Sequence, residues 1–293
     1  MADALPADLR LHDLELVAFD LEATGVAWGH DRIVELAALR FRFNRDGQVV
    51  PGPRWSTLVD PGQPIPEIVS RMTGIDAAVV AGAPPLEDVW SDLERALRGA
   101  VVVAHSVRSD LAWLGAEALR IGAAPLDATF YCTLEAARRV LPKAPRYTLP
   151  ALAEHLALPT EVGFHRAMAD ALHTRNLLAR CVQVAEATTV GELGWKEPAP
   201  WPDPDVYAVT VPERLTPLVD AVHRQERSGI VYRGGSGKHR RFKGFRPVTP
   251  LGFFAHEGVP YLRAWCHIDD AAKSFRCDRI ARVHVGWPVP SGA

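Results

Sequence analysis

The chain has 293 residues, of which 48% are hydrophobic and 23% are charged, a balance that is typical of folded globular proteins and excludes wholesale disorder. This length favours two domains over one. The net charge of −2 conceals an asymmetry: residues 205–293 carry 14 Lys or Arg and 8 Asp or Glu, a net of +6, whereas residues 1–204 carry 19 and 27, a net of −8. We therefore expect an acidic part suited to cations and a basic part suited to polyanions.

Features that would direct the chain to a membrane or out of the cell are missing from the sequence. No apolar run approaches the roughly 20 residues that cross a bilayer, and residues 1–10 lack a basic segment followed by an apolar one. The four cysteines are scattered and form no Cys-x-x-Cys pair, which favours neither a zinc knuckle nor a disulfide framework. We expect a reduced, cytoplasmic protein with no membrane partner.

The first part of the chain predicts an α/β fold in which strands come early and then alternate with helices. An apolar run at residues 14–22 predicts a buried strand, and further apolar runs and stretches of helical periodicity follow it. This order is typical of an α/β sheet that begins with hairpins. The expected strands are 14–22, 33–43, 54–59, 101–104 and 126–131, and the expected helices are 85–98, 110–121, 132–140, 148–157 and 165–184.

The composition changes near residue 197, where a proline occupies every second position through residue 204. This stretch excludes a helix or a central strand and predicts a stiff extended spacer. We expect an N-terminal domain at 1–184, a Pro-rich linker at 185–205 and a C-terminal domain at 206–293. In the last of these a helix is expected at 212–227, followed by short β runs near 229–233, 241–248, 250–254, 259–266 and 274–284, typical of a small barrel or sandwich.

Four acidic residues and one histidine stand at ends of the expected elements. Asp20 and Glu22 end the first strand on one face, where two carboxylates repel each other unless a proton or cation lies between them. Asp110 starts the helix after residues 101–104, and Asp170 lies five residues after His165 near the start of another helix. Taken singly, these residues are more often solvated surface groups or acids favoured by a helix dipole.

Taken together, these five residues indicate a metal-dependent hydrolase. Four carboxylates form a hard oxygen site that suits Mg²⁺ or Mn²⁺ better than zinc. Two such ions about 3.5–4 Å apart clamp the attacking and leaving oxygens of a phosphoryl displacement, and an imidazole can deprotonate the attacking water. The sequence therefore predicts phosphodiester hydrolysis with two divalent cations.

Three segments carry a resemblance to a known family. Asp-Leu-Glu-Ala-Thr-Gly at 20–25, Ala-His-Ser-Val-Arg-Ser-Asp at 104–110 and His-Arg-Ala-Met-Ala-Asp at 165–170 resemble the motifs of the DnaQ-like 3′–5′ exonucleases of the DEDDh subgroup. The resemblance covers residues 14–184. It implies a ribonuclease H-like mixed sheet with flanking helices, in which His165 is the general base and two divalent ions are bound by Asp20, Glu22, Asp110 and Asp170.

The resemblance carries further implications and two departures. By analogy, Thr24, Gly25 and Ile75 lie against the terminal nucleotide. A Tyr four residues before the last Asp would mark the sister subgroup, and Arg166 stands there, which favours the His form. The family usually has Asn and Phe where this chain has Ser106 and Ser109. Since every carboxylate is retained, we do not read these departures as inactivating.

The C-terminal part carries a basic run at 240–246, Arg-Arg-Phe-Lys-Gly-Phe-Arg. Cations interleaved with aromatics suit phosphates and stacked bases, and a solvated basic loop is an equal alternative. Residues 245–250, 259–265 and 275–280 resemble a WYL domain, although Pro260 stands at the name-giving Trp. The resemblance implies a small SH3-like β-barrel that binds nucleic acid or a ligand through Arg246, Tyr261 and Arg276. Tyr261 as a core residue and an Asp278–Arg279 ion pair are structural alternatives.

These observations favour a 3′–5′ exonuclease that acts on single-stranded nucleic acid with a free 3′ end. DNA and RNA stay open as substrates, since contacts to a 2′-hydroxyl depend on the shape of the pocket. The alternative is a regulator in which a weakly active nuclease fold supports a nucleic-acid- or nucleotide-binding domain. A polymerase or repair partner is left open.

Overall fold

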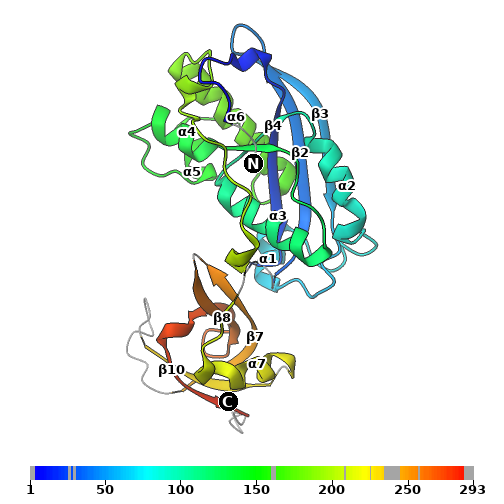
Figure 1. Cartoon of the computed structure of the whole chain (residues 1–293), viewed down its shortest axis with the longest axis vertical. Helices are drawn as coiled ribbons and strands as arrows, with labels where there is room; N and C mark the ends of the chain where they lie inside the picture. Colours follow the sequence, from blue (N-terminus) through cyan, green and yellow to red (C-terminus); the bar gives the residue numbers. More distant parts are fainter. Residues whose placement is uncertain are drawn as a thin grey trace. The chain divides into compact units, whose positions relative to one another are not determined.

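The computed structural model describes residues 4–25, 28, 31–159, 163–207, 209–224, 226–233, 245–256 and 258–286. The chain forms two compact units. The first comprises the residues up to Pro202 apart from 27–30, and the main part of the second starts at Asp203. Each unit is built on its own five-stranded sheet. Figure 1 traces the elements of both units along the chain.

The sheet of the first unit is mixed. Its strand order is β3-β2-β1-β4-β5. Strand β2 runs antiparallel to β1 and β3, whereas β4 and β5 run parallel to β1. Because β1 and β4 are parallel, their carboxyl ends meet at one edge of the sheet. The strands are β1 (Leu16–Ala23), β2 (Ile33–Phe43), β3 (Val49–Leu58), β4 (Val101–Ala104) and β5 (Thr129–Cys132).

The strands form where apolar residues gather, as the sequence predicts, and several bounds differ: β1 begins at Leu16 rather than 14, and β5 begins at Thr129 rather than 126. The first four residues of β1 and all of β4 are buried, as expected of strands covered on both faces. Strand β3 starts at Val49 rather than near residue 54. It includes Pro51 and Pro53, which an edge strand tolerates because one side of its backbone needs no partner.

Helices cover both faces of this sheet (Figure 1). One face carries α2 (Leu86–Leu97) and α3 (Val107–Ile121), which are joined by an ion pair between Arg120 and Glu87. On the other, α6 (Ala167–Ala185) packs against β1 and β2, and α4 (Thr133–Val140) and α5 (Leu149–His155) pack beside it. The short α1 (Glu67–Thr73) was not expected, because seven residues between prolines and Gly74 show too little periodicity.

Part of the predicted linker belongs to the first unit. Ala187, Val190, Leu193 and Trp195 are buried in its core. The indole of Trp195 stacks on Tyr131 with ring centroids 5.0 Å apart. These apolar side chains precede the proline-rich stretch and pack into the core of the first unit. Residues 187–195 therefore belong to that unit and are not part of an extended linker.

The second unit is a helix and an antiparallel sheet of order β10-β6-β7-β8-β9. Its core gathers around Leu218, Ile230 and Leu262. Among the residues that the structure describes, no ladder joins β9 to β10, the pairing that would close a barrel. The elements are α7 (Thr216–His223), β6 (Ser228–Tyr232), β7 (Arg246–His256), β8 (Val259–Cys266), β9 (Ala271–Arg276) and β10 (Ile280–Val285).

Three expectations for this unit are corrected. A single β7 replaces two expected strands, because a register shift between Pro250 and Gly252 lets the strand continue past the proline. The run at 274–284 is two strands, separated by a 3₁₀ turn at Cys277–Arg279. The helix expected at 212–227 ends at His223. Residues 240–244, which hold most of the basic run, lie outside the described residues.

All four cysteines are buried and unpaired. Within the described part of the chain, no helix combines the length and the apolar character needed to cross a bilayer.

Candidate active site

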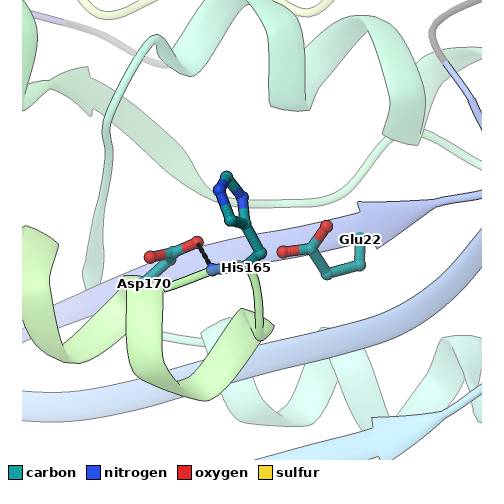
Figure 2. A group of neighbouring side chains, drawn as sticks. All are labelled: Glu22, His165 and Asp170. Carbon is teal, nitrogen blue, oxygen red and sulfur yellow. Dashed lines mark hydrogen bonds between the residues drawn. The ribbon is translucent and has the colours of Figure 1, made fainter. Parts of the chain in front are cut away.

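The residues predicted as catalytic come from three elements that meet at one edge of the first sheet. Glu22 lies near the end of β1, Asp170 in the first turn of α6, and His165 in the turn that precedes α6. Potential ligand atoms of these three side chains all lie within 4.8 Å of one another. Figure 2 shows His165 lying between the two carboxylates. The exposed imidazole is thereby next to the acids and open to water.

Asp20 on β1 and Asp110 on α3 belong to the same acidic group. Asp110 is in the first turn of α3, beyond the end of β4, and is 7% exposed. Burial raises the pKa of Asp20 well above its usual range, and the charges of Asp110, Asp170 and Glu22 raise it further. Burial likewise raises the pKa of Asp110, with a contribution from Glu22. These four carboxylates therefore share one electrostatic environment.

The shifts at Glu22 and Asp170 have the same origin. Burial followed by repulsion from Asp170 and Glu35 raises the pKa of Glu22 to about 8. Burial raises the pKa of Asp170, partly offset by the hydrogen bond from the His165 backbone and by nearby imidazoles. Carboxylates gathered in this way are mutually destabilising unless protons or cations neutralise them.

Two carboxylate oxygens have no partner among the described residues. Oδ2 of Asp110 and Oδ1 of Asp170 are buried and accept no hydrogen bond. The other oxygen of Asp170, Oδ2, accepts the backbone N–H of His165 at 3.0 Å. Buried oxygens without donors are costly unless a cation binds them. The acidic group therefore fits hard divalent cations, which prefer carboxylate oxygens.

A fifth acid next to the site was not predicted as functional. Glu35 on β2 lies directly opposite Glu22 in the β1–β2 ladder and is 5% exposed. Its carboxylate accepts two hydrogen bonds from Arg166 Nε and one from Nη2, and another from the backbone N–H of Ala167 at 2.8 Å. Glu35 thus fixes the start of α6. An acid within the apolar second strand was the sequence signal for Glu35. Its role could not be predicted because its partner, Arg166, lies 131 residues away in the chain.

Of the residues expected beside the terminal nucleotide, Thr24 and Gly25 directly follow β1, whereas Ile75 follows α1. The hydroxyl of Thr24 is buried and accepts hydrogen bonds from the Arg32 backbone at 2.9 Å and from Gln63 Nε2 at 2.8 Å. A Cβ at Gly25 would overlap the Asp31 carboxylate, so a larger residue there would have to displace that side chain. Ile75 is fully buried and packs with Val34 and Val80 rather than standing free.

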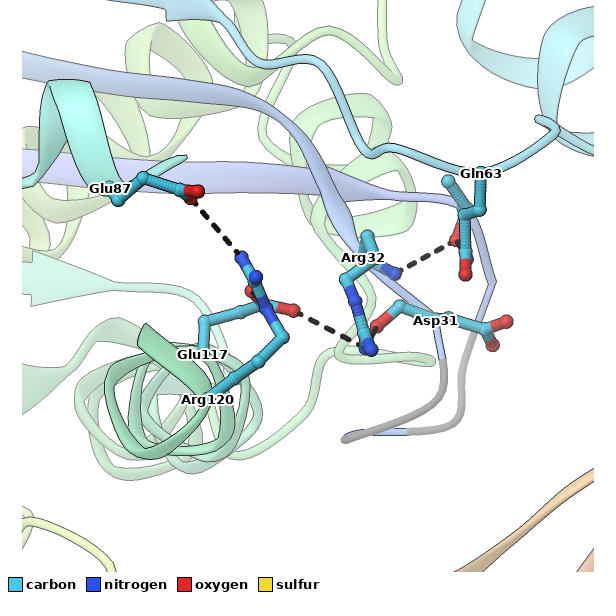
Figure 3. Close-up of polar contacts among 7 residues, drawn as sticks. Asp31, Arg32, Gln63, Glu87, Glu117 and Arg120 are labelled. Atoms are coloured by element: carbon cyan, nitrogen blue, oxygen red, sulfur yellow. Dashed lines mark hydrogen bonds and ion pairs between the residues drawn. The ribbon is translucent and has the colours of Figure 1, made fainter. Parts of the chain in front are cut away.

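An ion-pair network extends from this turn to α3 (Figure 3). Glu117 of α3 is 1% exposed, and its carboxylate lies 3.7 Å from Arg32 Nη1. Arg120 Nε donates to Glu117 Oε2 at 2.7 Å. Burial raises the pKa of Glu117, and the two guanidinium groups partly offset that effect. The network ties the end of the β1–β2 connection to the helix that carries Asp110.

The departures at Ser106 and Ser109 lie at the start of α3. Ser106 is in the left-handed region, with φ of 69°, and caps the helix. Its carbonyl accepts the Ser109 N–H at 2.7 Å. Asn adopts this conformation more readily than Ser, which gives a physical reason for the residue that the family usually has there.

In the second unit, the three predicted binding residues differ in exposure. Arg246 is 8% exposed, and its Nη1 contacts Asp269 at 2.7 Å and Cys266 Sγ at 3.1 Å. Tyr261 and Arg276 are partly exposed and lie opposite each other on β8 and β9. Tyr261 stacks on Phe254, and the Arg276 guanidinium pairs with both oxygens of Asp278.

Comparison with known proteins identifies both units. Residues 17–178 match the family model described as exonuclease, and residues 213–285 match the WYL domain. The chain is 31% identical over 182 residues to DNA polymerase III subunit epsilon of Aquifex aeolicus, which covers 61% of this chain and 87% of that protein. It is 34% identical over 173 residues to the PolC-type DNA polymerase III of Lacticaseibacillus paracasei, covering 59% of this chain but only 11% of that protein.

Solved structures agree on the fold of the first unit. The nuclease domain of 3′hExo, a DEDDh family member, aligns with a TM-score of 0.50 and 14% identity, covering 58% of this chain and 92% of that one. Cell-death related nuclease 4 aligns with a TM-score of 0.50 and 17% identity, covering 58% and 64%. With the mixed sheet and its helices, these matches give a ribonuclease H-like exonuclease fold. The chain belongs to the DnaQ-like exonuclease family, whose members are phosphodiester hydrolases that use divalent metal ions, and it carries a WYL domain after its nuclease unit.

Proposed function

We propose that this protein is a 3′–5′ exonuclease that removes nucleotides from the 3′ end of single-stranded DNA with two divalent cations, Mg²⁺ or Mn²⁺. The observation that carries the proposal is the grouping of Glu22, His165 and Asp170, with ligand atoms within 4.8 Å of one another, beside the partly buried Asp20 and the buried Asp110. The match to the epsilon subunit supports DNA as the substrate.

In this proposal, each residue has a role that follows from its position. Asp20, Glu22, Asp110 and Asp170 hold the cations, which when bound clamp the attacking and leaving oxygens and neutralise developing charge. The exposed imidazole of His165 takes the proton of the attacking water. Thr24, Gly25 and Ile75 shape the end of β1 where the terminal nucleotide is bound, and Arg32 and Gln63 fix the Thr24 hydroxyl.

A time course on 5′-labelled single-stranded DNA and RNA of equal sequence, with Mg²⁺, Mn²⁺ or EDTA, tests the proposal. We expect a metal-dependent ladder that shortens from the 3′ end, and we expect Asp20→Asn or Asp170→Asn to abolish it. Asp92→Asn is the matched control, since that acid is on the outside of α2 and pairs with Arg95. Full activity in Asp20→Asn would reject the assignment.

The other outcomes of this experiment identify the alternatives. Faster loss of the RNA strand would make RNA the substrate. An intact strand with retarded mobility under every metal would favour the regulator, in which the second unit carries the function. Products of intermediate length that appear without a ladder would indicate internal cleavage.

For the second unit we propose an SH3-like barrel that binds nucleic acid through the outer face of β7–β9. Tyr261 and Arg276 offer a ring and a cation side by side on that face, an arrangement that suits stacked bases and phosphates. Arg246 supports this face from within through Asp269. We further propose a cytoplasmic protein with a nuclease domain at 1–184, to which residues 187–195 add packed side chains, and a second domain at 206–293, acting alone or with a polymerase or repair partner.

A further inference from the structure

The turn that carries His165 has an unusual backbone. His165 has φ of 63° and Gly163 has φ of 70°, so two of the three residues before Arg166 lie in the left-handed region. Side chains other than glycine adopt this region at a cost, and such conformations persist only where surrounding contacts hold them. The contacts that hold this turn therefore determine where the imidazole of His165 lies.

Helix α6 provides those contacts through two side chains one turn apart. The Asp170 carboxylate accepts the His165 N–H at 3.0 Å. Three residues further along, His173 Nε2 lies 2.5 Å from the carbonyl oxygen of Gly163. The ring of His173 also stacks on Phe164, with centroids 4.2 Å apart and planes inclined by 24°. Each of the residues 163–165 is thus tied to α6, and His173 makes two of the three ties.

The surroundings of His173 fix which nitrogen carries its proton. The side chain is fully buried, and Nδ1 has no hydrogen-bond partner within the described residues. A carbonyl oxygen can only accept, so the contact with Gly163 requires a proton on Nε2. His173 is therefore a donor through Nε2 to the turn.

Packing alone does not account for a histidine here. Its neighbours on α6, Ala169, Ala171 and Leu177, are apolar and buried, and a phenylalanine would fill such a site without burying polar nitrogens. Among the described residues, the hydrogen bond of His173 goes to the turn before His165.

We propose that His173 is a positioning residue that holds the 163–165 turn, and through it the imidazole of His165, in the geometry required for proton transfer. The proposal rests on the proposed exonuclease function. It assigns His173 no contact with the substrate or the cations. Its loss should therefore lower kcat and leave KM nearly unchanged.

Three substitutions separate the two contacts of His173. His173→Phe keeps the stacked ring and removes the donor, whereas His173→Gln keeps an amide donor at a similar reach and removes the ring. Cys181→Ala is the matched control, because Cys181 is equally buried on α6 but lies two helical turns after His173, away from residues 163–165. Each variant is assayed for kcat and KM on labelled single-stranded DNA well below its unfolding temperature.

We expect kcat to fall about ten- to a hundred-fold in His173→Phe, as for other small displacements of a reacting group. His173→Gln should recover most of this loss, and Cys181→Ala should keep the wild-type kcat. Imidazole ¹⁵N spectra of the wild-type protein should show a proton on Nε2 of His173. This spectrum does not depend on activity.

The outcomes distinguish this inference from the proposed function. An inactive wild-type protein would remove the exonuclease assignment, while the spectrum would still report the tautomer. An active wild-type protein whose His173→Phe variant keeps the wild-type kcat would overturn the role of His173 alone. An equal loss of kcat in His173→Phe and Cys181→Ala would overturn it too, as would an Nε2 that carries no proton.

Discussion

Glu22 illustrates how single residues of this site respond to one another. Its carboxyl is half-buried, lies opposite Glu35 and faces Asp170, so its pKa rises from 4.5 to about 8. In the folded protein it keeps its proton over a range in which the unfolded chain has lost it. The folded state therefore loses stability as the pH rises through that range.

This shift predicts a pH-dependent stability in EDTA. The free energy of unfolding should fall as the pH rises from about 4.5 to about 8, the unfolded and folded pKa values of Glu22. Glu22→Gln should fall less steeply over the same range, and Mg²⁺ should restore stability to the wild type most strongly at pH 8. Urea denaturation at several pH values measures this. Parallel curves for the two proteins would contradict the prediction.

The sequence predicted most residues of the site but not the contacts between them. Asp20 and Glu22 could be assigned because strand alternation puts them on one face, and the motifs supplied Asp110, His165 and Asp170. The Glu35–Arg166 pair joins residues 131 positions apart, and it depends on the register of β1 with β2 and on the docking of α6. His173 lies in a helix whose pattern is satisfied by any apolar residue at that position.

At the scale of elements, the start of α3 aims Asp110 at the site. Ser106 caps this helix with φ of 69°, and no side-chain hydrogen bond supports the cap. The first turn of the helix therefore depends on a residue in a conformation that serine adopts reluctantly.

Ser106→Asn should stabilise the first unit by about 0.5–1 kcal/mol, because Asn adopts the left-handed region at lower cost. Ser109→Asn is the control. It is exposed inside the same helix, where Asn has no such advantage. Thermal unfolding of the three proteins gives the comparison. A destabilised Ser106→Asn variant would show that the Ser106 side chain has a role that its backbone does not reveal.

The elements themselves were largely predictable. Continuous apolar runs gave β1, β2 and β4, since strands covered on both faces must be apolar throughout. Proline made the predicted strand bounds wrong at two places, at the start of β3 and at Pro250 in β7. At both places tertiary pairing, at an edge and beside a bulge, accommodates a residue that local rules exclude.

At the scale of the whole molecule, each unit has a core of its own. Among the described residues, the core around β1 and α6 includes buried side chains as far along the chain as Trp195, and the buried core around β6–β10 includes Leu215 and residues after it. We therefore expect the two units to unfold in separate thermal transitions.

Calorimetry tests this independence. A divalent cation at about 100 times its Kd should stabilise the nuclease unit by about 2.7 kcal/mol, leave the other transition in place, and have no effect in Asp170→Asn. Arg246→Met should destabilise only the second unit, by about 1–3 kcal/mol, because it removes one buried charged contact of Asp269, which keeps its ion pair with Lys273. A single unfolding transition, with a midpoint that changes in both Asp170→Asn and Arg246→Met, would show that the units unfold together.

The burial of all four cysteines has a practical consequence. Burial raises the pKa of Cys181 and of Cys277 to about 12, so these thiols are doubly protected from electrophiles. A cysteine introduced on the surface of each unit would react with a maleimide dye before any native thiol. The wild-type chain is thus a suitable background for energy-transfer measurements of the distance between the two units with and without a divalent cation.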